Sequence, residues 1–324
     1  MGRAGTFAII LVLTILLAAG GLLLVGLAHA HAVAQQERDR ARLAQEQVAE
    51  TRAFHHPECW HIPVGRLPGV AVRAPIAPHL TEAVKQAQAR FSLVEFYVRF
   101  GKPFPLQQAI QISAAGAVPV IQLNPSGISL NQIDAGGYDS YLRAYAAAAS
   151  KFRCRVVLSF GHEMNGTWYS WGCTHTKAAV FIAAWQHVVT LMRTARNITW
   201  MWTTNTQNGP CTIQSRWPGA KYVDWVGVDG YIRKPAETFN ALFNATLAAV
   251  RHLAPSKTVI IAETGAIQGP SQQRVLRTIY RGAAHHNLRA VIYFDMTGKL
   301  GNYQPTTLEG FRAGIKYYTR KGAK

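Results

Sequence analysis

Residues 155–172 read RVVLSFGHEMNGTWYSWG, an apolar run that leads directly into a polar and aromatic segment. The run Arg155–Phe160 has the length and composition of a buried strand. Residues 258–265, TVIIAETG, repeat this arrangement further along the chain. We therefore predict that two carboxylates, Glu163 and Glu263, each stand at the C-terminal end of a buried strand.

Strand-like and helix-like patterns alternate from residue 70 onward. The predicted strands are Val70–Ala74, Leu93–Arg99, Val118–Leu123, Arg155–Phe160, Ile198–Thr203, Trp225–Gly230, Thr258–Ala262 and Ala290–Phe294. The predicted helices are Leu80–Ala89, Pro105–Ala115, Tyr138–Ser150, Lys177–Ala195, Phe239–Leu253, Ser271–His286 and Leu308–Tyr318. Near-continuous apolar strands are typical of a parallel sheet that is buried on both faces.

Eight strands with helices after most of them predict an α/β fold, a (β/α)8 TIM barrel. Active sites in this fold lie at the C-terminal ends of the strands, where Glu163 on the fourth strand and Glu263 on the seventh would face each other. The connection between the fifth and sixth strands lacks a clear long helix. An open doubly wound sheet is the alternative, but no glycine-rich phosphate loop supports it.

The N-terminal 30 residues are predicted to be a signal anchor or a signal peptide. Phe7–Ala28 is an apolar run of 22 residues, long enough to span a bilayer. Ala28-His29-Ala30 also matches a small-x-small cleavage pattern. We favour an uncleaved transmembrane helix, because the run exceeds the usual apolar region of a signal peptide. Residues 31–58 are predicted to form a helical stalk, and residues 59–324 the barrel.

The orientation of this segment is a point of conflict. More basic residues follow the apolar run than precede it, and the positive-inside count alone would keep the barrel in the cytoplasm. The cysteine usage and the pair of acids indicate instead that the barrel lies outside the cytoplasm. We expect an extracytoplasmic protein, either anchored in the membrane by its N-terminal helix or secreted.

The composition favours a large buried core, since 49% of the 324 residues are apolar and only 15% are charged. The formal net charge is +18, but Lys and Arg are scattered along the chain. We therefore expect no nucleic-acid partner, and a diffuse attraction to anionic envelope polymers. His55, His56 and His61 near Cys59 offer metal ligands, but a mixed loop is the simpler interpretation. No metal and no cofactor is expected.

The four cysteines are Cys59, Cys154, Cys173 and Cys211. They form no C-x-x-C pair, which argues against a zinc ribbon, and an even number behind an export signal indicates disulfides. Three pairings are possible. Cys173 and Cys211 follow neighbouring strands, so we favour that bridge together with Cys59–Cys154. Four unpaired buried thiols are the alternative.

Two carboxylates that face one cleft are the minimum equipment for hydrolysing a glycosidic bond. Retention of configuration needs carboxyl groups about 5–5.5 Å apart, and inversion needs about 6.5–9.5 Å. Trp168 and Trp171 are candidate platforms for sugar rings, because flat apolar sugar faces stack on indoles. For Trp171 a place in the core is the alternative.

Residues 162–172, HEMNGTWYSWG, resemble the acid/base motif of glycoside hydrolase family 26, which comprises β-mannanases and their relatives. Residues 223–231, VDWVGVDGY, resemble the strand-6 motif of that family, and residues 262–265, AETG, resemble its nucleophile motif. The resemblance extends from about Val70 to Tyr318. It implies a retaining, endo-acting hydrolase of a β-linked polysaccharide, with Glu163 as acid/base, Glu263 as nucleophile and β-mannan as the first substrate to test.

The resemblance also implies roles for residues around the pair. Tyr231 is expected to donate a hydrogen bond to Glu263, and His162 to orient the carboxylates. The further candidates for substrate contact are Asn165, Trp168, Trp171, Trp202, Asn205 and Asp295. Of Trp200 and Trp202 on the fifth strand, one is expected to face the barrel interior.

Two departures from the family pattern indicate a divergent branch. Phe294-Asp295 stands where many relatives carry a tryptophan. Ser159-Phe160-Gly161 precede His162, where typical mannanases have an arginine nearby. Two other functions are therefore considered: a carbohydrate-binding barrel without catalysis at the cell envelope, and an envelope structural protein. Mixed-linkage β-glucan, β-1,3-xylan and a self-made exopolysaccharide are alternative substrates, and the basic charge favours an anionic polymer.

Overall fold

The computed structural model describes residues 33–38, 59, 62–206, 211–298, 301–306 and 308–320. The strands are β1 (Leu67–Ala71), β2 (Leu93–Arg99), β3 (Val118–Asn124), β4 (Val156–Phe160), β5 (Ile198–Asn205), β6 (Trp225–Ile232), β7 (Thr258–Ala266) and β8 (Ala290–Phe294), with a short hairpin of β9 (Thr297–Gly298) and β10 (Gly301–Asn302). The helices are α2 (Ile76–Ala87), α3 (Leu106–Ala114), α4 (Leu130–Asp134), α5 (Asp139–Phe152), α6 (Ala178–Met192), α7 (Phe239–Leu253), α8 (Gln272–His285) and α9 (Leu308–Arg320).

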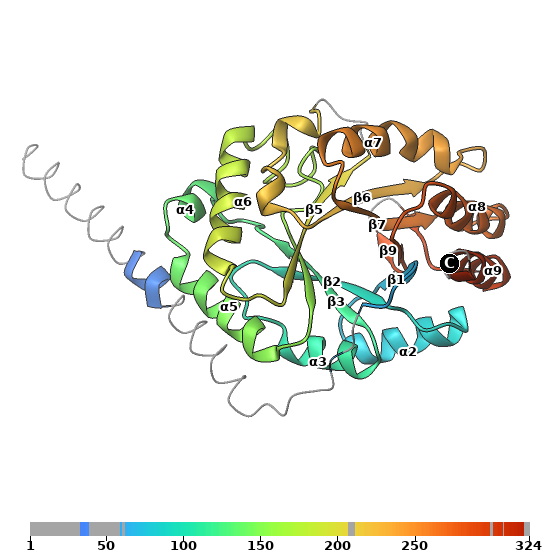
Figure 1. The fold of residues 1–324 in the computed structure, drawn as a ribbon, viewed down its shortest axis with the longest axis horizontal. Helices are drawn as coiled ribbons and strands as arrows, with labels where there is room; N and C mark the ends of the chain where they lie inside the picture. The colour runs from blue at the N-terminus through green and yellow to red at the C-terminus, as the bar shows by residue number, and fades with distance from the viewer. Residues whose placement is uncertain are drawn as a thin grey trace, which may run out of the picture.

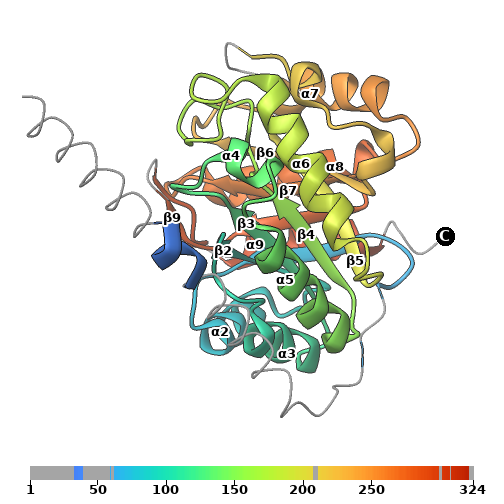
Figure 2. The ribbon, with the colours of Figure 1, turned by 90° about the vertical axis from the view of Figure 1, so that its left-hand side faces the viewer.

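Strands β1 to β8 form a closed parallel barrel in chain order, and β8 returns to pair with β1. The helices surround the barrel (Figure 1), and α5 and α6 lie side by side on its outer surface (Figure 2). The closure confirms the predicted (β/α)8 barrel and excludes the open doubly wound sheet. As the sequence indicated, the β5–β6 connection carries only two 3-10 turns, Gln214–Arg216 and Ala220–Tyr222, in the part described.

The first strand is the clearest error of the prediction. It runs from Leu67 to Ala71, three residues earlier than expected, and α4 was not anticipated. Pro68 and Gly69 are poor strand formers, so the start of β1 could not be recognised from the sequence pattern. They are tolerated there because the Pro68 carbonyl still accepts a bond from the Ser92 N–H, and a side chain at Gly69 would meet Ile292 at 2.8 Å.

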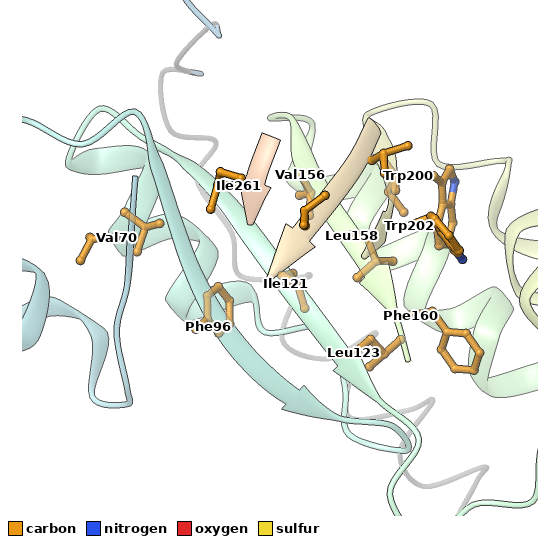
Figure 3. Packing of buried hydrophobic residues seen from close by; sticks show 14 of the residues in the cluster. Val70, Phe96, Ile121, Leu123, Val156, Leu158, Phe160, Trp200, Trp202 and Ile261 are labelled. Carbon is orange, nitrogen blue, oxygen red and sulfur yellow. The ribbon is translucent and has the colours of Figure 1, made fainter. Parts of the chain in front are cut away.

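Two buried apolar clusters follow from the alternation of side chains along the strands. One fills the barrel interior and includes Leu93, Val120, Met201 and Ile260. The other lies between the strands and the helices, and Figure 3 shows part of it. Because apolar side chains point both inward and outward, the strands read as near-continuous apolar runs in the sequence.

Trp200 and Trp202 correct one expectation. Both are buried in the outer cluster, and Figure 3 shows them on one side of β5. Trp202 packs edge-on against Trp217, with ring centroids 5.1 Å apart. Residues i and i+2 of a strand share a face, so neither tryptophan points into the barrel. Trp202 is therefore a core residue and not a candidate for substrate contact.

The barrel interior becomes polar toward the C-terminal ends of the strands. Glu95, Gln122, Ser159, Thr203 and Asp229 are all buried there. The hydroxyl groups of Ser159 and Thr203 are hydrogen-bonded at 3.0 Å across β4 and β5. This polar layer forms the floor beneath the residues at the barrel mouth.

A β-bulge at Ala262 turns Glu263 into the barrel. Val228 pairs with Ile261, but the next residue, Asp229, pairs with Glu263, so Ala262 is an extra residue in β7. Ile260 and Ala262 both face the interior cluster, and strict alternation would send Glu263 outward toward the helices. The bulge restores Glu263 to the inner side, next to Asp229.

Two disulfides have the pairing that the sequence favoured. Cys59–Cys154 ties the segment before β1 to the start of β4, and Cys173–Cys211 joins the loops that follow β4 and β5. The second bridge therefore fastens together two loops at the mouth of the barrel.

Most of the predicted N-terminal elements lie outside the described residues, including the apolar run 7–28 and the histidines 55, 56 and 61. Within the predicted stalk, residues 33–38 are helical, and Gln36 Nε2 donates to the Tyr138 hydroxyl at 3.2 Å. No helix in the described ranges is long and apolar enough to cross a bilayer. The same ranges contain no group of three or more His, Cys, Asp or Glu placed to hold a metal ion.

Candidate active site

Glu163 stands in the loop after β4, where the backbone turns sharply. Gly161 and Glu163 have φ angles of 61° and 52°, a left-handed conformation that is uncommon for a residue other than glycine. The Glu163 N–H donates to the Thr203 carbonyl at 2.9 Å. Strained backbone of this kind is concentrated at functional sites. Here it brings the Glu163 side chain against the end of β5.

The Glu163 carboxyl is buried and held by two donors. Asn205 Nδ2 donates to Oε1, and Trp168 Nε1 donates to Oε2 at 2.8 Å. Asn165 positions Asn205: its Oδ1 accepts from the Asn205 N–H at 2.9 Å, and its Nδ2 donates to the Asn205 carbonyl at 3.0 Å. Asn165 is itself buried, so the structure gives it a place behind the site, whereas the sequence suggested contact with a sugar hydroxyl.

The three aromatic residues after Glu163 differ in exposure. The Trp168 side chain is 55% exposed, and its ring lies over Gly166, where a Cβ would approach it to 2.4 Å. Trp171 is buried, stacks on Tyr169 with centroids 4.3 Å apart, and donates from Nε1 to the His162 carbonyl at 2.7 Å. Of the two proposed platforms, only Trp168 therefore offers a free face.

Glu263 is also buried, at the inner side of β7. The Tyr231 hydroxyl donates to its Oε2, which is the contact expected from the sequence. His162 Nε2 lies 4.0 Å from Oε1, too far for a hydrogen bond. Oε1 has no partner of normal hydrogen-bond geometry among the described residues.

His162 is a neutral imidazole fixed by two contacts. Nδ1 lies 2.9 Å from Oδ1 of Asn124, an acceptor, so Nδ1 carries the proton. Nε2 then accepts from the Tyr169 hydroxyl at 3.1 Å. Burial lowers the pKa of His162 to about 3, which agrees with an uncharged ring. His162 therefore packs beside the carboxylates but forms no ion pair with them.

The pKa values of both glutamates are raised. Burial is the main cause for each, and the neighbouring Glu163 carboxylate adds to it in raising the pKa of Glu263 to about 7. The Asn205 and Trp168 donors and the Arg233 guanidinium oppose the rise in the pKa of Glu163. Because like charges repel, ionisation of Glu163 disfavours ionisation of Glu263.

A cavity of about 150 Å³ adjoins the pair. Its lining residues are Asn205, Thr206, Gly230, Tyr231, Arg233, Lys234, Glu237 and Leu242. Asn205 and Tyr231 are the residues that contact Glu163 and Glu263, respectively. The Arg233 guanidinium lies over the Tyr231 ring, 5.6 Å from its centroid, and its Nε donates to the Tyr303 hydroxyl at 3.2 Å. The cavity therefore carries a cation, Arg233, whose charge acts on Glu163.

Asp295 does not join this group. It follows β8, its N–H donates to the Ala71 carbonyl, and the charges that act on it belong to Glu82 and His79. Burial raises the pKa of Asp295 to about 6.

Sequence reasoning missed several residues of the site, above all Glu95 on β2 and Asp229 on β6. Both are fully buried. Glu95 could have been found, because it is a lone charge at an inward position of an otherwise apolar strand, residues 93–98. Asp229 lay inside the quoted strand-6 segment but was given no role. No pattern in the sequence marked Arg233 or Tyr303 as site residues, since only the fold brings them to Tyr231.

Comparison with known proteins supports this picture. The sequence model of glycosyl hydrolase family 26 matches residues 133–289, which include Glu163 and Glu263. A curated relative, mannan endo-1,4-β-mannosidase A and B from Caldalkalibacillus mannanilyticus, is 35% identical over 83 residues, or 23% of this chain and 16% of the relative. The chain thus matches only a small part of the length of that protein.

Solved structures share the fold at low sequence identity. An endo-β-1,4-mannanase double mutant from Cellulomonas fimi has a TM-score of 0.64 and 16% identity, over 77% of this chain and 70% of that one. A family 26 β-mannanase from Bacteroides ovatus has a TM-score of 0.59 and 15% identity, over 87% and 93%. The family match covers both glutamates, so the chain is similar to glycosyl hydrolase family 26, with the sequence of a divergent relative, and the solved structures share its fold.

Proposed function

We propose that the protein is a glycoside hydrolase that cleaves a β-linked polysaccharide with retention of configuration, using Glu163 as acid/base and Glu263 as nucleophile. The observation that carries the proposal is the pair of buried carboxyl groups that follow β4 and lie on β7, each held by its own donors. A pair of this kind is what the double-displacement reaction requires.

The first step would divide the work between the two groups. Glu263, ionised and held by the Tyr231 hydroxyl, attacks the anomeric carbon while Glu163 gives its proton to the leaving oxygen. Burial raises the pKa of Glu163, which helps Glu163 to keep its proton until the leaving oxygen takes it. The C–O bond to the leaving sugar breaks as the bond between the sugar and Glu263 forms.

The second step would reverse the roles. Glu163, now ionised, takes a proton from water as the water attacks the anomeric carbon, and Glu263 leaves as a carboxylate. Glu163 can serve both steps because Asn205 and Trp168 hold its oxygens in place in either state.

The substrate is proposed from the relatives and the aromatic surface. The curated relative is a mannan endo-1,4-β-mannosidase, so β-1,4-mannan is the first polymer to test and endo cleavage the first mode. The exposed face of Trp168 would stack on one sugar ring. The two disulfides favour an oxidising compartment outside the cytoplasm, where an N-terminal anchor or export signal would place the enzyme.

A substrate screen followed by substitution tests the proposal. Purified protein is incubated with β-mannan, glucomannan, mixed-linkage β-glucan and β-1,3-xylan, and reducing ends are measured. With any accepted polymer, Glu263→Ala should abolish turnover, and added azide should restore part of it as a glycosyl azide of inverted configuration. Substantial activity in Glu263→Ala would remove Glu263 from the role of nucleophile. Binding without cleavage by the unaltered protein would favour a carbohydrate-binding barrel instead.

A further inference from the structure

Two basic side chains line the cavity of about 150 Å³ at the barrel mouth, and the proposed reaction steps use neither of them. Arg233 and Lys234 follow directly after Ile232, the last residue of β6, and both side chains are exposed. Neither takes part in any ion pair among the described residues. The cavity therefore holds two cations that no described carboxylate neutralises by direct contact.

Glu237 lines the same cavity, but its contacts are with the backbone. Its Oε2 accepts from the Arg233 backbone N–H at 3.0 Å, and its own N–H donates to the Lys234 carbonyl at 3.1 Å. The Glu237 carboxylate thus closes the turn after β6 and forms no ion pair with either basic side chain. Two cations against one carboxylate leave the lining of the cavity with a net positive charge.

The Arg233 guanidinium is oriented by two aromatic residues. Its Cζ lies 5.6 Å from the centroid of the Tyr231 ring, and its Nε donates to the Tyr303 hydroxyl at 3.2 Å. The Tyr231 and Tyr303 rings pack on each other with centroids 4.7 Å apart. Within the described part of the chain, the terminal nitrogens Nη1 and Nη2 of Arg233 have no acceptor. These two nitrogens form the fork that binds a carboxylate through two parallel hydrogen bonds.

The cavity adjoins the proposed catalytic pair on two sides. Tyr231, against which the Arg233 guanidinium lies, donates its hydroxyl to Glu263. Asn205, which also lines the cavity, donates to Glu163. A group bound in this cavity would therefore belong to a sugar at or next to the scissile bond.

We propose that this cavity is a subsite for a carboxylate of the polysaccharide, so that the preferred substrate is a β-linked polymer that contains uronic acid units. The Nη fork of Arg233 binds the carboxylate, and Lys234 adds a second positive charge. Both cations offset the repulsion between the bound carboxylate and ionised Glu263. This inference rests on the proposed function, because it assigns the substrate class of the same site. The net charge of +18 attracts the same class of polymer at longer range.

Matched pairs of polymers test the inference. Glucomannan and mixed-linkage β-glucan are each compared with a form partly oxidised at C6, in which carboxylates replace primary hydroxyl groups. Binding is measured by calorimetry with the full chain carrying Glu263→Gln, which keeps an acceptor for the Tyr231 hydroxyl and should prevent cleavage. The oxidised form of a polymer should bind about tenfold more tightly than its neutral form at low salt. Salt at about 1 M should remove most of this difference.

Substitutions in the same background assign the preference to the cavity. Arg233→Gln should weaken binding of the oxidised polymer about tenfold and leave binding of the neutral polymer unchanged. Arg233→Lys keeps the charge but loses the fork, so it should retain only part of the preference. The control for a general loss of positive charge is Lys316→Gln, an exposed residue of α9, which should retain the full preference. Thermal unfolding checks that each variant is folded.

Several results would overturn the inference. Equal binding of oxidised and neutral polymers, or no binding of the oxidised forms, would remove the carboxylate subsite. A preference that survives in Arg233→Gln, or that falls equally in Lys316→Gln, would assign the attraction to the protein surface as a whole. Cleavage of neutral polymers without a preference for acidic ones would refute the subsite alone. Binding of acidic polymers through Arg233, without cleavage by the unaltered protein, would support the subsite and count against the hydrolase proposal.

Discussion

Trp168 donates its indole N–H to Oε2 of Glu163 at 2.8 Å, while 55% of the Trp168 side chain remains exposed. One residue thus combines a hydrogen bond to the proposed acid/base with a free aromatic face. The two contributions can be separated by substitution.

Trp168→Phe removes the N–H and keeps an aromatic face, whereas Trp168→Ala removes both. Loss of the donor destabilises ionised Glu163 and raises its pKa, so the alkaline limb of kcat/KM should move upward in both variants. KM should rise strongly in Trp168→Ala alone, by about tenfold for the loss of about 1.4 kcal/mol of stacking. Steady-state kinetics over a pH series measures both effects. Equal KM values in the two variants would argue against a stacking role.

Tyr231→Phe removes the hydroxyl that holds Oε2 of Glu263. That hydrogen bond lowers the pKa of Glu263, so its loss should raise the pKa and move the acid limb of kcat/KM upward by about one pH unit. The matched control is Tyr145→Phe, since the buried Tyr145 hydroxyl has no partner among the described residues. An unchanged acid limb in Tyr231→Phe would contradict the assignment of Tyr231 as the donor.

Arg233→Gln tests the cation at the cavity. The positive charge of Arg233 lowers the pKa of Glu163, so its removal should raise that pKa. Glu163 must be protonated for the first step, and activity is lost as pH rises through its pKa. The alkaline limb should therefore move upward, by a few tenths of a pH unit because Arg233 is exposed.

Ionic strength supplies a second measurement on Arg233. Added salt should shift the alkaline limb of the wild type in the same direction and should have less effect on Arg233→Gln, because screening weakens the same attraction. Lys316→Gln, an exposed residue of α9, is the control for a general loss of positive charge. A downward shift in Arg233→Gln would contradict the prediction.

The two disulfides should differ in their effect on activity. Replacing Cys173 and Cys211 by serine opens a loop of 38 residues and should lower the free energy of unfolding by roughly 3–4 kcal/mol. Replacing Cys59 and Cys154 opens a loop of 95 residues and should cost roughly 4–5 kcal/mol. Urea denaturation measures both values.

Only the loss of Cys173–Cys211 should also reduce kcat, because this bridge holds the loop that carries Trp168. Assays are made well below the unfolding transition of each variant. An equal loss of kcat in both double variants would show that the Cys173–Cys211 bridge has no specific effect on the site.

The order of strands and helices could be predicted because it depends on local patterns. Apolar runs such as residues 258–262 must be buried on both faces, and short connections between strands and helices leave few ways to arrange eight such units. Glu163 and Glu263 were found for the same reason, since each follows or ends a run that could be counted. Pro68 and Gly69 concealed β1 because a strand can contain weak strand formers when its neighbours supply the pairing.

The direction of individual side chains depended on tertiary structure. Local alternation would turn Glu263 away from the barrel, and the bulge at Ala262, which becomes apparent only when β7 pairs with its neighbouring strands, turns it back. Glu95 and Arg233 became part of the site because closure of the barrel brings distant strands and loops together around one polar layer. The sequence by itself determined which segments form the barrel, since burial and periodicity are local properties. Which carboxyl groups meet was decided by strand register and by the burial of these side chains inside the closed barrel, and neither is encoded in any single segment.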